Sequence, residues 1–129
     1  MSRKSILIIG ASRGLGKQWV REYLKKHTEF DVYATVRKDD TLNDLAEEYG
    51  KRLVIISNFD VSSDSLISDL KNGKFSNILP EFLDLVIYNA GILSFEPNFS
   101  EDFSYEHAIK QYNVNALGIL RVFEGIERK

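Results

Sequence analysis

Apolar residues in this sequence gather in four short runs, each bounded by polar residues or glycine. Short apolar runs between turn signals are typical of strands that are buried on both faces of a parallel sheet. The second run is also rich in β-branched residues, which favours a strand. The four predicted strands are Ser5–Ile9, Asp31–Val36, Arg52–Ser57 and a stretch that begins at Leu83.

Between these runs, apolar residues recur at the spacing of an α-helix. The first helix is predicted to follow the first strand and to bury one stripe of side chains, with Trp19 in the core. The stripe consists of Leu15, Trp19, Val20, Tyr23 and Leu24. Three further helices are predicted: one over residues 42–49 closed by Gly50, one within 62–73, and a long one from about Asp102 to about Arg128 after a loop at 98–102.

Strand and helix thus alternate along the chain. This order predicts an α/β fold, a doubly wound parallel sheet with right-handed crossovers and helices on both faces. The length of 129 residues fits one domain over residues 1–129, and neither a linker nor an internal repeat divides it.

Composition and charge limit the kinds of partner that we expect for this chain. A net charge of −2 makes nucleic acid a poor expectation, because the chain has no excess of positive charge to meet a phosphate backbone. The absence of cysteine and the presence of only two distant histidines give no metal-binding pattern. No apolar run is long enough for a signal peptide or a membrane span, so we expect a cytoplasmic protein without a membrane partner.

Three glycines lie between the first strand and the first helix. Gly10, Gly14 and Gly16 place bare backbone at a helix N-terminus, where unpaired N–H groups and the helix dipole favour an anion such as a pyrophosphate. The spacing differs from a P-loop, since five residues separate Gly10 from Gly16 and Gln18 replaces the hydroxyl residue. It also differs from Gly-x-Gly-x-x-Gly. A tight strand-to-helix turn without a ligand is the alternative interpretation.

The sequence "GASRGLG" resembles the cofactor loop of the short-chain dehydrogenase/reductase family, and three later motifs agree in order and place. "NFDVSS" matches the family's adenine site, "NAG" its segment beside the nicotinamide ribose, and "YNVNALG" its helix asparagine. The resemblance implies a Rossmann-type fold with strand order 3-2-1-4 and a dinucleotide cofactor. It implies Asn115 as a catalytic residue, and as cofactor-binding residues Gly10, Ser12, Arg13, Gly14, Leu15, Gly16, Arg37, Asp60, Val61, Asn89, Ala90 and Gly91.

Charge at the end of the second strand bears on the type of cofactor. An acidic residue there would bind the ribose 2′-hydroxyl, whereas an arginine accommodates a 2′-phosphate. Arg37 stands at that place and Arg13 lies in the glycine loop, so the two can clamp one phosphate and NADP(H) is favoured over NAD(H). The alternative is that both arginines are solvated surface charges, with Asp39 and Asp40 weakening the local field.

The family's reaction, hydride transfer between nicotinamide and a carbonyl or alcohol, uses a Tyr-x-x-x-Lys pair and a serine. None of the six tyrosines is followed by lysine four positions later. The sequence therefore looks like the cofactor half of such an oxidoreductase, truncated after the fourth strand and the following long helix, and we expect it to be inactive alone.

Truncation would leave the fourth strand as an apolar edge without a guarding proline or lysine, beside a helix with apolar residues on more than one face. We expect a homo-oligomer formed through that edge and helix, or a piece of a longer reductase. Two other functions stay open. One is a non-catalytic nucleotide-binding module, and the other is an interaction protein in which the glycine loop is a relic.

Overall fold

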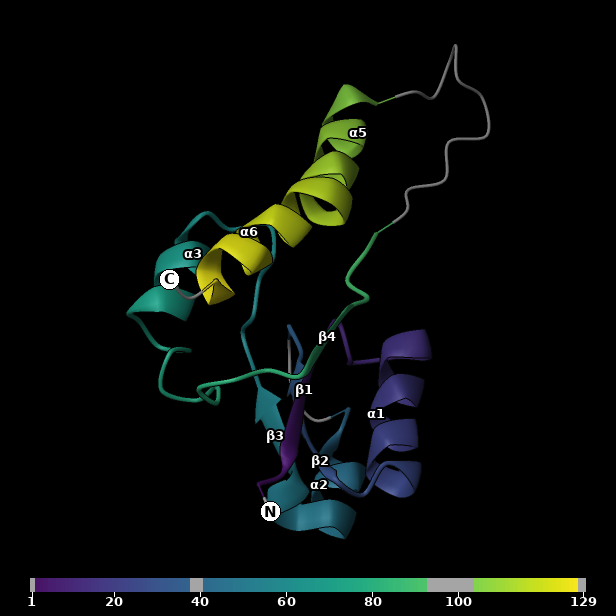
Figure 1. Cartoon of the computed structure of the whole chain (residues 1–129). Helices are drawn as coiled ribbons and strands as arrows, with labels where there is room; N and C mark the ends of the chain where they lie inside the picture. Colours follow the sequence, from purple (N-terminus) through teal and green to yellow (C-terminus); the bar gives the residue numbers. More distant parts are fainter. Residues whose placement is uncertain (1, 38–40, 93–103, 128–129) are drawn as a thin grey trace.

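The computed structural model describes residues 2–37, 41–92 and 104–127. Four parallel strands form one sheet in the order β3-β2-β1-β4, as the sequence predicts (Figure 1). They are β1 (Lys4–Ile9), β2 (Phe30–Thr35), β3 (Leu53–Ile56) and β4 (Leu85–Tyr88). Each predicted strand is present, with its bounds shifted by one or two residues.

Helices cover both faces of the sheet, so the doubly wound architecture is confirmed. The helices α1 (Gly14–Lys26) and α2 (Asn43–Tyr49) pack on one face, against side chains such as Ile6 and Ile8 of β1. On the other face, α3 (Ser65–Lys71) and α6 (Gly118–Ile126) pack against Leu7 and Ile9. Alternate residues of β1 thus serve two separate hydrophobic layers.

The buried stripe of α1 is narrower than the sequence predicts. Val20 and Leu24 are fully buried, but Trp19 is 41% exposed and Leu15 is 72% exposed, so their assignment to the core is wrong. Both lie to one side of the buried positions of α1, which are Gly16, Val20 and Leu24. Trp19 instead lies near the ring of Tyr23, with 6.3 Å between the two ring centroids.

The second and third helices follow the prediction with small changes. Gly50 caps α2 with a φ of +56°, a conformation that favours glycine. A short 3₁₀ turn over Gly50–Arg52 then leads into β3. The third helix begins only at Ser65, because residues 61–64 form turns, and it ends at Lys71.

The predicted long helix is interrupted. Helix α5 (Tyr105–Tyr112) passes into a π-helical turn over Asn113–Leu117 and then into α6. Helical periodicity in the sequence does not distinguish such a turn from continuous helix. The predicted ends at Asp102 and Arg128, and the predicted loop at 98–102, lie outside the described residues.

Strand β4 is an edge strand, as the truncated topology predicts. Its pairing with β1 is extended by Asp84, whose carboxylate accepts a hydrogen bond from the Ser5 N–H at 2.8 Å while its own N–H donates to the Ser5 carbonyl at 2.9 Å.

Among residues 2–37, 41–92 and 104–127, no helix has both the length and the apolar content of a membrane span.

Candidate functional site

The turn between β1 and α1 is built so closely that two of its positions require glycine. Gly10 has a φ of +84°, and a Cβ there would lie 2.7 Å from the backbone N and Cα of Ala90. A Cβ on Gly16 would collide with the Gly10 carbonyl oxygen. Gly14 has a φ of +58° with open space around it, so its requirement is conformational only. The turn therefore lets α1 begin directly against the end of β1.

The first turn of α1 can accept an anion. Its residues 14–17 include no acidic side chain, and the preceding residue, Arg13, provides no side-chain cap for the helix N–H groups. Free N–H groups and the positive end of the helix dipole remain at this end of a helix of 13 residues. A phosphate or pyrophosphate placed there would meet both.

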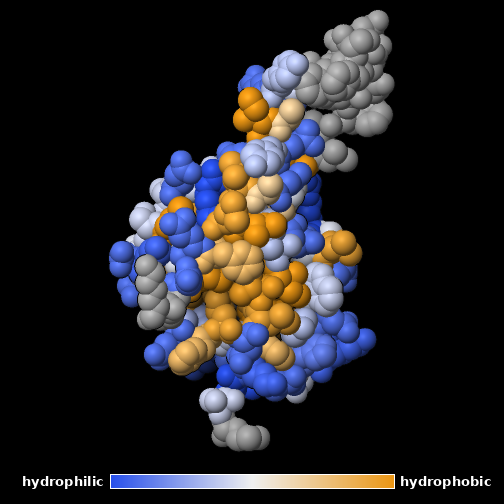
Figure 2. Space-filling model, turned by 45° about the horizontal axis from the view of Figure 1, so that its top comes forward, coloured by the Kyte–Doolittle hydropathy of each residue, from blue (hydrophilic) through white to orange (hydrophobic). Residues whose placement is uncertain are grey.

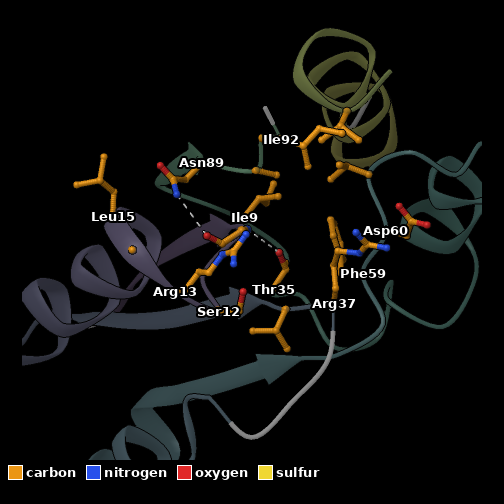
Figure 3. A pocket seen from close by; sticks show the side chains of 17 residues that line it. Ile9, Ser12, Arg13, Leu15, Thr35, Arg37, Phe59, Asp60, Asn89 and Ile92 are labelled. Atoms are coloured by element: carbon orange, nitrogen blue, oxygen red, sulfur yellow. Dashed lines mark hydrogen bonds between the residues drawn. The ribbon is translucent and has the colours of Figure 1, made fainter. Parts of the chain in front are cut away.

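A cleft of about 360 Å³ opens beside this turn, at the carboxyl ends of β1, β2 and β4 (Figure 3). The strand order reverses between β1 and β4, and doubly wound sheets bind their ligands at such a reversal. All of the predicted site residues line the cleft except Gly16 and Asn115. Gly16 instead lies close to the Gly10 carbonyl and the Asn89 side chain, and Asn115 contacts the lining residue Ile92, as described below.

Thr35, the last residue of β2, is a lining residue that the sequence analysis missed. Its side chain is almost fully buried, and its hydroxyl accepts a hydrogen bond from the Gly10 N–H at 3.1 Å. Its carbonyl accepts from the Ala11 N–H at 2.9 Å. Thr35 therefore holds the glycine turn from the side of β2. A polar residue directly after the buried Val32 and Ala34 of this strand was the available signal.

Phe59 and Ile92 also line the cleft without having been predicted. Phe59 is buried beside the predicted adenine-site residue Asp60, and Ile92 follows the predicted segment Asn89–Gly91. Both are apolar residues next to a recognised motif, so nothing in the sequence distinguished them from ordinary core residues.

Asn89 joins the far wall of the cleft to the glycine turn. Its N–H donates to the Ile9 carbonyl at 2.8 Å, and its side-chain amide donates to the Gly10 carbonyl at 3.4 Å. The segment Asn89–Gly91 is thereby held beside the carboxyl end of β1, where it lines the cleft.

Asp60 is a carboxylate whose negative charge is well stabilised. It accepts hydrogen bonds from the Ser62 hydroxyl at 2.6 Å and the Ser62 N–H at 2.9 Å. The Ser62 hydroxyl lowers the pKa of Asp60 most; the Ser62 N–H and the charges of Arg37 and Arg121 lower it further against the opposing effect of burial. At neutral pH this side chain is therefore an acceptor of hydrogen bonds.

Arg13 and Arg37 border the cleft from different elements. Figure 3 shows Arg13 on the side of the glycine turn, whereas the Arg37 guanidinium is turned toward Asp60. The two predicted phosphate-binding arginines thus share one cleft. The Arg37 charge already interacts with the carboxylate of Asp60.

Asn115 lies in the π-helical turn and pairs with the backbone beyond β4. Its side-chain oxygen accepts from the Ile92 N–H at 2.7 Å, and its amide nitrogen donates to the Ile92 carbonyl at 2.7 Å. Asn115 therefore pairs with the backbone just beyond β4 through both atoms of its side-chain amide. Asn115 reaches the cleft through Ile92, which lines it.

Comparison with known proteins gives consistent results. The family model for short chain dehydrogenase matches residues 4–128. The chain is 34% identical over 115 residues to a benzil reductase of Saccharomyces cerevisiae that forms (S)-benzoin, covering 84% of this chain and 40% of the relative. It is 32% identical over 126 residues to a short chain dehydrogenase of Penicillium aethiopicum, covering 95% of this chain and 48% of the relative.

A solved structure shares the same arrangement. A short-chain dehydrogenase/reductase of Burkholderia multivorans with bound NADP superposes with a TM-score of 0.80 and 33% identity, over 96% of this chain and 52% of that protein. The chain thus spans about half the length of the relatives that it matches.

Proposed function

The chain belongs to the short-chain dehydrogenase family, and on that premise we propose that its cleft binds NADP(H) as the cofactor half of an oxidoreductase acting on carbonyl or alcohol substrates. The observation that carries the proposal is the closely built glycine turn, which opens a helix at the point where the strand order reverses. Bound in the cleft, the cofactor would supply or accept hydride at its nicotinamide ring.

In this proposal the two ends of the cleft bind different parts of the cofactor. The N–H groups at the start of α1 face the pyrophosphate, and the Asp60 carboxylate accepts a hydrogen bond from the adenine amino group. The segment Asn89–Gly91 lies beside the ribose next to the nicotinamide. Support comes from the cleft itself, which these residues line together.

We favour NADP(H) over NAD(H) because two cationic side chains, Arg13 and Arg37, border the cleft where an acidic residue would serve NAD(H). A 2′-phosphate carries more negative charge than the single carboxylate of Asp60, so it can draw the Arg37 guanidinium away from that neighbour. Charge-assisted hydrogen bonds to guanidinium are among the stronger contacts in proteins.

Turnover requires a proton donor that the family supplies from a Tyr-x-x-x-Lys pair, and this sequence contains no such pair. We therefore propose that these 129 residues bind the cofactor without catalysing the reaction, and that the remaining catalytic groups belong to the part of the relatives that this chain does not cover.

Calorimetric titration of the chain with NADPH and with NADH tests the proposal. Saturable binding with a lower Kd for NADPH is expected. In Arg37→Ala the Kd for NADPH should rise about 10- to 100-fold, the equivalent of one charged hydrogen bond, while that for NADH changes little. Arg21→Ala, on α1 and outside the cleft lining, is the matched control. Equal losses for both cofactors would refute the phosphate contact, and no binding by a folded chain would refute the site.

A second candidate function rests on a different face. Helices α5 and α6 expose large apolar side chains, and Figure 2 shows apolar residues gathered in a band on this face. The exposed residues on these two helices are Tyr105, Ile109, Tyr112, Leu120 and Phe123, with Leu85 at the open edge of β4. We propose that the 129-residue chain self-associates here, since an unpaired apolar edge can pair with a second copy. Sedimentation as a monomer at high concentration would contradict it.

A further inference from the structure

The π-helical turn at Asn113–Leu117 deprives one carbonyl of its usual hydrogen-bond donor. In a regular α-helix the Gly118 N–H would donate to the Val114 carbonyl, four residues earlier. Here it donates to the Asn113 carbonyl instead. A partly buried carbonyl without a donor is costly, so the Val114 oxygen needs another partner.

Tyr88, the last residue of β4, supplies that partner. Its hydroxyl donates to the Val114 carbonyl at 2.7 Å. Burial raises the pKa of Tyr88 to about 12, against the opposing effect of the Arg121 charge. The phenol therefore remains protonated at neutral pH and serves as a donor, which makes it unsuitable for proton transfer.

Gly118 provides the space for this contact. A Cβ on Gly118 would collide with the Tyr88 hydroxyl oxygen and would lie 3.0 Å from the Cβ of Val61. Gly118 has ordinary helical angles, with a φ of −58°, so its backbone does not require glycine. The need for a small residue here is steric: the Tyr88 hydroxyl is the nearest obstacle, and the Val61 side chain is the second.

The turn held by Tyr88 carries Asn115, which pairs in both directions with the backbone of Ile92. Two ties therefore join adjacent residues of the helix to the strand and its extension: Val114 to Tyr88 and Asn115 to Ile92. They stand on either side of Asn89–Gly91, the segment that lines the cleft. Movement of the turn would free the Ile92 end of this wall, whereas Asn89 at the other end keeps its hydrogen bonds to Ile9 and Gly10.

We propose that Tyr88 is a positioning residue: its hydroxyl replaces the donor that the π turn removes from Val114, and so holds Asn115 against Ile92 and fixes the Asn89–Gly91 wall of the cleft. The inference rests on the proposed function only in taking this wall to contact the cofactor. The placement of Asn115 itself follows from the contacts alone.

Hydrogen exchange measured by NMR tests the inference without any ligand. In Tyr88→Phe the protection of the Ile92 amide should fall at least 10-fold relative to amides of β1, and the signals of the Asn115 side-chain amide should shift. Normalising to β1 removes any global loss of stability. Tyr33→Phe is the matched control, because the Tyr33 hydroxyl on β2 has no hydrogen-bond partner among the described residues. Unchanged relative protection of Ile92 in Tyr88→Phe would overturn the inference.

A double-mutant cycle provides an independent test. Gly118→Ala should lower the unfolding midpoint more in the wild-type chain than in the Tyr88→Phe background, where the obstructing hydroxyl is gone. Additive effects would mean that the hydroxyl and Gly118 are not coupled, and would overturn the steric part of the inference.

NADPH titration of the same variants separates this inference from the proposed function. Weaker binding by Tyr88→Phe, together with loss of Ile92 protection, supports both. If the wild-type chain does not bind NADPH, the proposed function fails, whereas the exchange result still decides the role of Tyr88.

Discussion

The neighbouring strands β1 and β4 have almost the same apolar composition and very different surroundings. Residues Ile6–Ile9 of β1 pair in register with Leu85–Tyr88 of β4. The four residues in β1 are at most 1% exposed, whereas Leu85 is 38% exposed and the other three in β4 are partly exposed. The difference arises because β1 has a strand on each side, whereas β4 pairs with β1 alone among the residues that the structure describes. An apolar sequence predicts that a strand will be buried, but the elements packed around the strand determine how far it is buried.

The candidate cleft lies between these two regions. Its first wall, the glycine turn with Thr35, lies beside the enclosed strand β1. Backbone hydrogen bonds and the buried Thr35 hydroxyl hold it in place. Its second wall, Asn89–Gly91, follows the edge strand β4. The hydrogen bonds of Tyr88 and Asn115 join the two ends of this wall to the π-helical turn. We therefore expect packing to hold the first wall in place when a residue is substituted. The second wall should depend on a few hydrogen bonds.

The largest effect should come from equal truncations in the two strands. Ile8 and Ile87 are register partners, with Ile8 fully buried and Ile87 partly exposed. Ile8→Ala should lower the free energy of unfolding by about 3–4 kcal/mol, and Ile87→Ala by about 1–2 kcal/mol, because less surface and less cavity are involved. Urea denaturation followed by circular dichroism measures both. Equal losses would show that β4 is as well enclosed as β1.

Glycine substitutions should distinguish the two walls of the cleft. Gly10→Ala combines an unfavourable φ with a Cβ 2.7 Å from the Ala90 backbone, so it should cost about 2 kcal/mol of stability and weaken NADPH binding at least 10-fold. In Gly91→Ala the nearest atom, Asn115 Oδ1, would lie 3.4 Å from the Cβ, an ordinary contact. This variant should lose less than about 1 kcal/mol. Thermal unfolding and calorimetry measure both quantities, and a larger loss at Gly91 would reverse the assignment of the rigid wall.

A charge on the open edge should change association more than stability. Leu85→Lys should shift the chain toward monomer in sedimentation velocity, since lysine on an edge strand opposes pairing. Stability should change by less than about 0.5 kcal/mol, as is usual at the surface. Trp19→Lys is the control, because Trp19 on α1 is similarly exposed, at 41% against 38% for Leu85. Equal effects of the two variants would mean that association does not involve β4.

The smallest effect concerns pH. Because the folded-state pKa of Asp60 is lowered, its contribution to stability is present above the unfolded value of 3.8 and is lost as the pH falls through the folded value. Asp60→Asn lacks this contribution at every pH, so its stability should fall less than that of the wild type as the pH decreases from 7 to 3. Urea midpoints between pH 7 and 3 give the comparison. An acid profile identical to that of the wild type would show that Asp60 is not stabilised as described.

Much of the fold and of the candidate cleft could be predicted because the signals are local. The glycine turn follows directly from its sequence, Asp60 stands shortly after the third predicted strand, and Asn89 stands at the end of the fourth. Leu15 and Trp19 were misplaced, because helical spacing identifies the direction of a buried stripe but not its width. Thr35 was missed because its importance depends on a contact with Gly10, 25 residues away in the sequence.

By itself, the sequence determined the order of strands and helices, the parallel sheet and the position of the glycine turn, since periodicity and glycine spacing act over a few residues. Only the tertiary structure decided that Arg37 is turned toward Asp60, that the long helix contains a π turn, and that Tyr88 satisfies the carbonyl released there. These features depend on which polar groups meet across the fold, and a buried hydrogen bond between distant residues leaves no periodic trace in the sequence.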